Sequence, residues 1–448
     1  MIRLAFLLLG ARAFRPQAWI LAIAGAVWLA LGVLILLDMR NPEIVFVLDT
    51  LAVFMAIEGA VYLAVALARG LRRHWLAALR GIGFMAAGFL VYNVEWDHNL
   101  GAVIVFGIAF LLEGLLRIGT ALVLKGRRWR GGLAGGVIML VLSLVILLQW
   151  PLPHGVTVPF CFALLLITSG YALLRLAREL RQLPAGGSIT SLPLYAEHNW
   201  QARGIAVPAL PPEQALPTQG ELHVHVWTAT GSIPDPQRRL LVDRYVAAID
   251  SKGMVSTGHS ALELPPDLYV SHYPAVELDH GAGDLRAILY SGPENDVPGR
   301  FQPSLQVEAA EWCQPDRTVT FHTFNAAALR AFWQLYARDT TYNLTARNCS
   351  STVILALDAA TEGLAFRGRA WRGLLRLMLN PDFWLLRLIR GRAEAMTWTP
   401  GLVLDYATML REVLEHADRR WSYRLRRLFT RPAGPGSVDA VSSGHPQR

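Results

Sequence analysis

Residues 342–363, YNLTARNCSSTVILALDAATEG, contain a cysteine at the start of an apolar run with helical spacing. Gly363 marks a C-terminal stop, and either Asn348 or Ser350 is a candidate cap for the first turn. A cysteine at a helix N-terminus lies where unpaired backbone N–H groups and the helix dipole favour the thiolate. Cys349 is therefore the candidate nucleophile. The rest of the chain has to indicate which residue is its general base and in which compartment the domain lies.

Apolar residues are concentrated before residue 180, although 53% of all 448 residues are hydrophobic. This length allows two or three domains, and a composition shift near Pro184 separates a membrane domain, 1–182, from a soluble part. The net charge of +8 does not indicate nucleic acid binding, because most arginine clusters adjoin apolar segments or lie in the C-terminal quarter.

Six segments are long and apolar enough to cross a bilayer with a hydrocarbon core of about 30 Å: 17–37, 43–68, 76–94, 101–124, 132–150 and 157–177. Arginine-rich stretches follow the second, fourth and sixth segments, whereas the other connectors carry little positive charge. The positive-inside rule therefore predicts a multi-pass protein of the inner (plasma) membrane with a cytoplasmic N-terminus and a cytoplasmic C-terminal domain. The short apolar stretch after Arg3 resembles a signal peptide, but we expect an interfacial lead-in to the first span.

The spans repeat at intervals of 55 and 56 residues. Even-numbered spans carry a polar residue followed by glycine, and odd-numbered spans carry two small residues seven apart. The first set is Glu58-Gly59, Glu113-Gly114 and Ser169-Gly170, and the second is Gly25 with Gly32, Gly81 with Gly88, and Gly136 with Ser143. Small residues allow membrane helices to approach closely, so the pattern predicts a six-helix transmembrane bundle of three repeated helical hairpins. In span number, repeat length and glycine placement, residues 10–182 resemble the HdeD family of membrane proteins associated with acid resistance.

Several ionisable side chains lie within or near these spans: Asp49, Glu58, Arg80, Glu113 and Arg117. Buried charges in a membrane are expensive and therefore mark candidate functional sites. Structural pairing is the favoured interpretation, because Glu113 and Arg117 are one helical turn apart and Glu58 could meet Arg80 across a hairpin. A proton or ion pathway is the alternative.

The soluble part begins with a Pro/Gly-rich linker, 183–220, followed by a mixed α/β domain, 221–365. Alternating apolar residues predict strands, and Asn325 is expected to cap an amphipathic helix. The predicted strands are 221–227, 256–264, 268–278, RAILY and TVTFHTF, and a helix is expected in QRRLLVDRYVAAID.

His259 and His272 lie on two successive predicted strands. We expect both imidazoles on one face of a sheet, with the Cys349 helix packed against that face. Cysteine catalysis needs a thiolate, an imidazole that exchanges its proton, and a polar group that orients the imidazole.

The order His259, His272, Cys349, with Tyr342 and Asn348 beside the cysteine, resembles the circularly permuted papain-like enzymes. These include NlpC-related peptidases, PPPDE peptidases and the lecithin:retinol acyltransferase group. The resemblance covers residues 220–365 and implies a permuted papain-like α+β fold. It also implies that Cys349 is the nucleophile, that His259 is the general base and that His272 is the orienting residue. Glu263 and Asp279 compete for the orienting position, and Asn348, Ser350 and Tyr342 support the nucleophile motif.

Other chemistries have less support in the sequence. His223 and His225 share one strand face, but no further Cys or Asp completes a familiar zinc spacing, so no metal is expected. No nucleotide-binding glycine motif occurs, and no cofactor is predicted. Cys161, Cys313 and Cys349 are too far apart for a disulfide framework, which fits a reducing cytosol.

Residues 366–430 predict basic amphipathic helices rich in arginine and tryptophan, and 431–448 predict a disordered tail. The helices would lie either in the lipid headgroup layer or against the rest of the protein.

The favoured hypothesis is a membrane-anchored cysteine hydrolase of the peptidase or amidase type, acting on a peptide or an acyl/amide substrate, lipid-linked substrates included. A lipid acyltransferase would use the same Cys-His site. The rival class is a non-enzymatic acid-stress membrane protein with a degenerate cytosolic binding domain.

Overall fold

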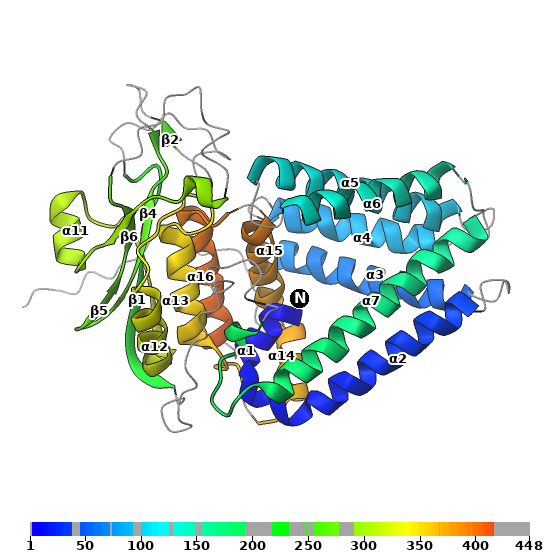
Figure 1. Ribbon diagram of the computed structural model, residues 1–448, viewed down its shortest axis with the longest axis horizontal. Helices are drawn as coiled ribbons and strands as arrows, with labels where there is room; N and C mark the ends of the chain where they lie inside the picture. The colour runs from blue at the N-terminus through cyan, green and yellow to red at the C-terminus, as the bar shows by residue number, and fades with distance from the viewer. Residues whose placement is uncertain are drawn as a thin grey trace, which may run out of the picture.

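In the computed structural model, an N-terminal helical region is followed by a mixed α+β C-terminal region (Figure 1). The structure describes residues 2–37, 45–71, 74–92, 100–124, 129–148, 150, 154–192, 195, 217–232, 245, 248–249, 255–276, 291–366, 368–395 and 397–415. Of the helix predicted in 237–250, the structure describes only residues 245, 248 and 249, and Ala248–Ile249 form a strand instead. The RAILY strand, Asp279, most of the linker and the tail lie outside the described residues, as does the side chain of Asp49.

Each of the six apolar segments forms one long helix: α2 (Ala18–Leu37), α3 (Val45–Arg69), α4 (Trp75–Tyr92), α5 (Leu100–Leu124), α6 (Trp129–Leu148) and α7 (His154–Gln182). Large apolar side chains on these helices are exposed, including Trp28 and Phe54. Within the described residues, four apolar stretches are long enough to cross a membrane: Arg3–Leu37, Val103–Val123, Trp129–Leu148 and Phe160–Gln182. Two further apolar stretches, Ala52–Leu67 and Trp75–Phe89, are shorter. Since lipid is the solvent that accommodates such surfaces, the chain is a multi-pass membrane protein.

The repeated small residues mark the contacts between paired helices. A Cβ on Gly25 would lie 2.8 Å from the carbonyl oxygen of Gly170, and one on Gly81 would lie 2.8 Å from that of Gly59. Ser143 Oγ donates a 2.8 Å hydrogen bond to the Gly107 carbonyl. The repeat therefore correctly identified the interfaces between helices.

Consecutive helices form two of the three predicted hairpins, α3–α4 and α5–α6. The third pair joins α2 and α7, the first and last spans, which are distant in the chain. Sequence spacing identified the contact surfaces but did not specify which small-residue surface each helix would meet.

Helix α1 (Ile2–Phe14) is a core element of the C-terminal region, which corrects the predicted interfacial lead-in. Leu7, Leu8 and Leu9 are fully buried, and their region packs against α13, α14 and the 3₁₀ helix η2 (Ile189–Ser191). The amides of Gly363 and Ala365 donate hydrogen bonds of 3.0 and 2.9 Å to the Leu7 and Leu8 carbonyls. A second 3₁₀ helix, η1 (Arg15–Gln17), joins α1 to α2.

The C-terminal region is built on an antiparallel sheet with strand order β5-β4-β1-β8. Its strands are β1 (Thr218–Trp227), β4 (His259–Leu264), β5 (Leu268–Val270) and β8 (Arg317–Phe324). Two small ribbons pair β2 (Ala248–Ile249) with β3 (Val255–Ser256), and β6 (His272–Pro274) with β7 (Gly299–Phe301). The 3₁₀ helix η4 (Pro293–Asn295) precedes β7.

Helices cover both faces of this sheet unequally (Figure 1). One face packs against α12 (Ala326–Tyr336), α13 (Cys349–Thr361) and α16 (Pro400–Glu415), and is called here the α13 face. The short helix α11 (Leu305–Glu311) lies on the opposite side, the α11 face. As predicted, the Asn325 side chain caps α12, accepting from the Ala328 amide at 2.9 Å.

The arginine-rich segment forms α14 (Ala370–Met378) and α15 (Pro381–Ala395), which differ in how they pack against the rest of the protein. Helix α15 packs against α3, where the Trp384 and Tyr62 rings meet edge to face at 5.3 Å. It is also tied to α13 by a buried bidentate pair between Arg390 and Asp358, at 2.9 and 2.7 Å. Of the two predicted locations, α15 is therefore packed against the rest of the protein, whereas α14 has an exposed apolar side.

Candidate functional site

Cys349 is the first residue of α13, and Asn348 caps that helix. The Asn348 side chain accepts from the Ser351 amide at 2.8 Å, while the Asn348 amide donates to Ser351 Oγ at 2.9 Å. The side-chain Nδ2 of Asn348 also donates to the Leu344 carbonyl at 2.7 Å and to the Trp398 carbonyl at 3.0 Å. Of the two predicted caps, Asn348 is the correct one, and it fixes the orientation of the helix end that carries the thiol.

Cys349 is 8% exposed, and its thiol lies beside hydroxyl groups. Its Sγ lies 3.7 Å from Ser350 Oγ, and Ser350 Oγ lies 3.2 Å from Ser260 Oγ on β4. Burial raises the pKa of the Cys349 thiol, while hydrogen bonds from Ser350 and from the backbone and side chain of Ser260 act in the opposite direction. The resting cysteine is therefore a thiol with donors already placed for a thiolate.

His259 lies on the α11 face, among aromatic rings. Its Nε2 is 2.9 Å from Ser271 Oγ and 3.2 Å from Glu308 Oε1, and its ring stacks on Tyr273 with centroids 4.1 Å apart. Burial, with a smaller contribution from His272, lowers the pKa of His259 to about 3. The ring is therefore neutral at pH 7. If its proton is on Nε2 it donates toward Glu308 and Ser271, which leaves Nδ1 as the basic nitrogen.

Contacts with the covering helices place the two predicted imidazoles on opposite faces of the sheet, which corrects the expectation of one shared face. His259 contacts Glu308 of α11, whereas His272 contacts Thr352 of α13. Ser260, the residue after His259 on β4, contacts Ser350 of α13. Directly opposite residues share a face and consecutive residues alternate. Pattern alone could not fix this, because a one-residue change in register would reverse it.

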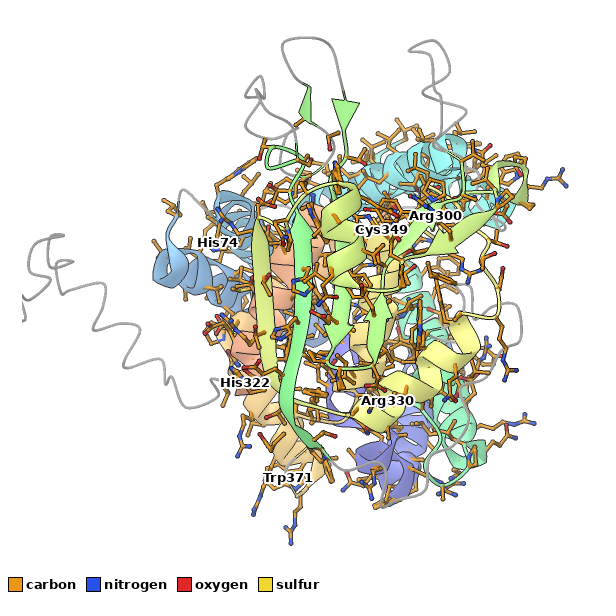
Figure 2. All side chains as sticks on the ribbon, turned by 90° about the vertical axis from the view of Figure 1, so that its left-hand side faces the viewer. His74, Arg300, His322, Arg330, Cys349 and Trp371 are labelled. Atoms are coloured by element: carbon orange, nitrogen blue, oxygen red, sulfur yellow. The ribbon has the colours of Figure 1, made fainter. Side chains whose placement is uncertain are left out.

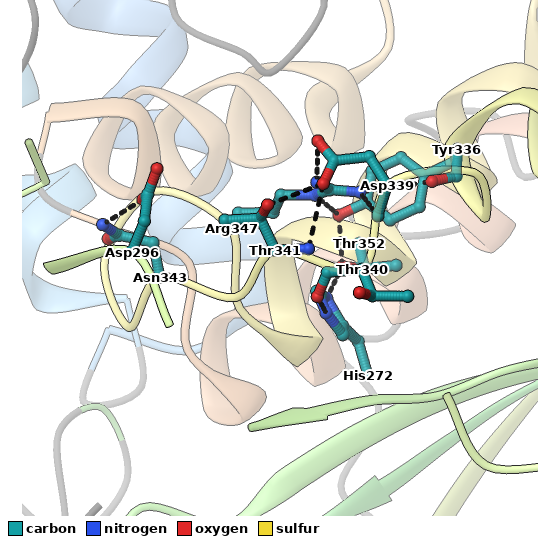
Figure 3. A network of polar contacts seen from close by, with 9 residues as sticks. All are labelled: His272, Asp296, Tyr336, Asp339, Thr340, Thr341, Asn343, Arg347 and Thr352. Atoms are coloured by element: carbon teal, nitrogen blue, oxygen red, sulfur yellow. Dashed lines mark hydrogen bonds and ion pairs between the residues drawn. The ribbon is translucent and has the colours of Figure 1, made fainter. Parts of the chain in front are cut away.

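His272 lies on the α13 face and is held on both sides (Figure 3). Its Nδ1 is 3.2 Å from Thr352 Oγ1, and its Nε2 is 3.2 Å from the Thr340 carbonyl. Burial lowers the pKa of His272 to about 4, and the hydrogen bond to Thr340 opposes this shift. With both ring nitrogens engaged, His272 joins α13 to the loop before Cys349.

Glu308 is the carboxylate at His259, and sequence reasoning missed it. It is 1% exposed and accepts hydrogen bonds from the hydroxyls of Tyr269 and Tyr273, at 2.6 and 2.7 Å. Burial raises the pKa of Glu308, and these hydrogen bonds oppose the shift. The predicted competitor Glu263 instead contacts His225 at 2.9 Å, and Asp279 lies outside the described residues.

One sequence signal could have identified Glu308. Ser304 caps the short helix α11 by accepting from the Val307 amide, and Glu308 follows within the first turns. A capped helix just before the last strand can cover one sheet face. However, only the tertiary fold reveals which histidine lies under it.

The thiol lies where two strands separate. Pairing of β4 with β5 ends at Leu262 and Val270, and β6 pairs with β7 instead. Burial and Glu308 raise the pKa of Tyr273, with a smaller contribution from Cys349. Cys349 therefore interacts with Ser260 on β4 and is within electrostatic range of Tyr273 on β6, the residue on which His259 stacks.

Tyr342 lies near both His272 and Cys349. Its ring centroid is 5.1 Å from that of His272, and its amide donates to the Val297 carbonyl at 2.8 Å. Burial raises the pKa of Tyr342, with a further contribution from Cys349. Arg347 braces the intervening loop, with its guanidinium 4.4 Å from the Tyr336 ring (Figure 3).

The membrane-embedded polar residues form two separate groups. Glu113 and Arg117 pair at 2.7 Å on an exposed side of α5, as predicted. Glu58 pairs with Arg387 of α15 at 3.1 Å, not with Arg80 as expected. The Arg80 guanidinium lies 5.0 Å from the centroid of the Tyr62 ring. Glu58 thus connects the membrane region to the C-terminal region, a contact between residues 329 apart that periodicity cannot predict.

His223 and His225 are neighbours on β1, with ring centroids 5.8 Å apart. Each Nδ1 lies 3.0 Å from a threonine hydroxyl on β8, and His225 Nε2 contacts Glu263. Burial lowers the pKa of His225, and Glu263 opposes the shift. These contacts join neighbouring strands.

Comparison of the chain with protein-family models, with curated proteins and with solved structures finds no match. The function therefore has to be argued from the geometry described above.

Proposed function

We propose that this protein is a six-span membrane protein of the inner membrane, with an HdeD-like bundle and a cytoplasmic, permuted papain-like cysteine hydrolase domain. The observation that carries the proposal is the position of Cys349 at the capped end of α13, beside Ser260. Ser260 directly follows His259, and Glu308 holds the Nε2 side of that histidine.

The topology rests on charge and on helix ends. The start of α2 and the end of α7 carry exposed arginines, including Arg15 and Arg178, and these ends adjoin the C-terminal region. Positively charged ends face the cytoplasm. The six-span count extends the four long apolar stretches by α3 and α4, which pair closely through Gly59 and Gly81.

In the proposed reaction, the Cys349 sulfur attacks a substrate carbonyl and His259 accepts the thiol proton on Nδ1. Because the two side chains lie on opposite faces of the sheet, this transfer requires the ring to reach the sulfur where the pairing of β4 with β5 ends. Glu308 positions the ring through Nε2. Backbone N–H groups at the head of α13 stabilise the oxyanion. The imidazolium then protonates the departing amine, leaving an acyl thioester. Water resolves the thioester, with His259 again accepting a proton, and this releases the acid and the free thiol.

The proposed substrate class follows from the location of the domain. The domain is fixed to the membrane through α1 and α15, so its substrates are peptides or acyl amides at the membrane surface, including lipid-linked ones. Resolution of the thioester by a lipid amine or alcohol would make the same site an acyltransferase.

The test is labelling of the full-length protein in detergent with a cysteine-directed electrophilic probe, read out by peptide mass spectrometry. We expect modification of Cys349 in preference to Cys313, and loss of that preference in His259→Gln and Glu308→Gln. His223→Gln is the matched control, because it removes an imidazole on β1 that does not contact the site. Unchanged labelling of Cys349 in His259→Gln would refute the proposal.

Two observations favour the second candidate, a binding module without catalysis. Burial raises the pKa of the Cys349 thiol, and the ring of His259 lies on the α11 face. In that case Cys349 and Cys313 are labelled slowly and equally at neutral pH, whatever residue occupies position 259.

A further inference from the structure

Helix α14 has one side packed on protein and another side that the described residues leave uncovered. Ala370, Gly373 and Leu377 are buried. A Cβ on Gly373 would lie 2.6 Å from Leu9 Cδ2, so α14 approaches α1 closely at this point.

The other side of α14 is apolar and exposed. Trp371, Leu375 and Leu379 recur four residues apart and are 53%, 51% and 62% exposed. Exposed large apolar side chains in one row at helical spacing mark an interaction surface.

Cationic side chains flank this row. Arg372 and Arg376 are exposed, and the Arg372 guanidinium lies 5.3 Å from the centroid of the Trp371 ring. An apolar row containing tryptophan beside arginines is typical of helices that lie at the lipid headgroup level.

The place of α14 in the fold indicates what contacts this row of apolar side chains. Helix α1, on which α14 packs, continues through η1 into α2, whose first turn exposes Trp19 to lipid. Figure 1 shows α14 beside the start of α2 and the end of α7, and Figure 2 shows Trp371 at the outer edge of the molecule.

Further exposed arginines lie just before α2 and in the last turns of α7. They are Arg12 of α1, Arg15 of η1, and Arg175, Arg178 and Arg181 of α7. Such a belt attracts anionic headgroups electrostatically.

We propose that α14 lies in the headgroup layer of the cytoplasmic leaflet, with Trp371, Leu375 and Leu379 inserted among acyl chains and Arg372 and Arg376 bound to anionic phospholipid. The C-terminal domain is thereby held at a fixed orientation to the bilayer. This inference is independent of the thiol chemistry.

The test uses a photo-crosslinking amino acid, p-benzoyl-phenylalanine, in place of Leu375 in the full-length protein in nanodiscs containing phosphatidylglycerol. Val307 is the matched control position, because it is an exposed apolar residue on α11, on the far side of the sheet from the membrane helices. We expect phospholipid adducts several-fold more abundant at position 375 than at position 307.

A double charge reversal, Arg372→Glu with Arg376→Glu, should lower the yield at position 375 in anionic nanodiscs and leave it unchanged in zwitterionic ones. Equal lipid adducts at the two positions would overturn the proposal. Crosslinks from position 375 to a second copy of the chain would also overturn it, since they would identify the row as a dimer contact.

Discussion

Replacing Gly10 with alanine tests whether α1 is a structural part of the C-terminal region. Gly10 has φ 73° and ψ 166°, a conformation that is nearly exclusive to glycine. An alanine Cβ there would lie 2.8 Å from Gly363 Cα, so the two backbones would have to separate. That separation strains the hydrogen bonds from Gly363 and Ala365 to the α1 carbonyls.

The expected loss of stability has two contributions, backbone strain and weakened hydrogen bonds. Backbone strain at such a φ costs about 1–3 kcal/mol. Weakening two hydrogen bonds adds about 1–3 kcal/mol. Since about 1 kcal/mol shifts the melting temperature of a domain of this size by roughly 2–4 °C, we expect a loss of roughly 10 °C.

Gly70→Ala is the matched control. Gly70 also has a positive φ, of 101°, but a Cβ there would meet nothing within 4 Å. It therefore reports the strain alone. Thermal unfolding of full-length protein in detergent, followed by size-exclusion chromatography, measures both variants. If Gly10→Ala melts no lower than Gly70→Ala, the close contact between α1 and Gly363 does not contribute to stability, and the reasoning fails.

Three further predictions concern buried and embedded charges. Asp358→Asn leaves the Arg390 guanidinium without its buried partner and should lower the free energy of unfolding by about 3–5 kcal/mol in denaturant titrations. Glu58→Gln should make α15 more accessible to protease, whereas Glu113→Gln, which removes an exposed pair on α5, should not. Burial lowers the pKa of His259 from 6.5 to about 3, so between these values the unfolded chain binds a proton that the folded chain does not. Stability should therefore fall with acidification by about 1.4 kcal/mol per pH unit, and His259→Gln should show a shallower fall in unfolding experiments from pH 7 to 4.

The sequence alone predicted features that depend on local pattern. Hydropathy located the six apolar helices to within a few residues, since a long apolar run has few alternatives to a membrane span. The spacing of small residues located the contact surfaces of α2, α4 and α6, because small side chains allow membrane helices to approach closely. Asn348 was recognised as a candidate cap because capping involves residues three apart.

Tertiary structure decided the features that depend on partners distant in the chain. The apolar run of α1 fits a lipid or a protein environment equally well by composition, and only the fold placed it in a core with Leu9 against Gly373. His259 lies on β4 and His272 on β6, which do not pair with each other, and only the packing of α11 and α13 decided that His272 lies on the face of the Cys349 helix. Glu308 became the partner of His259 because α11 covers that face, a contact between residues 49 positions apart that no local pattern encodes.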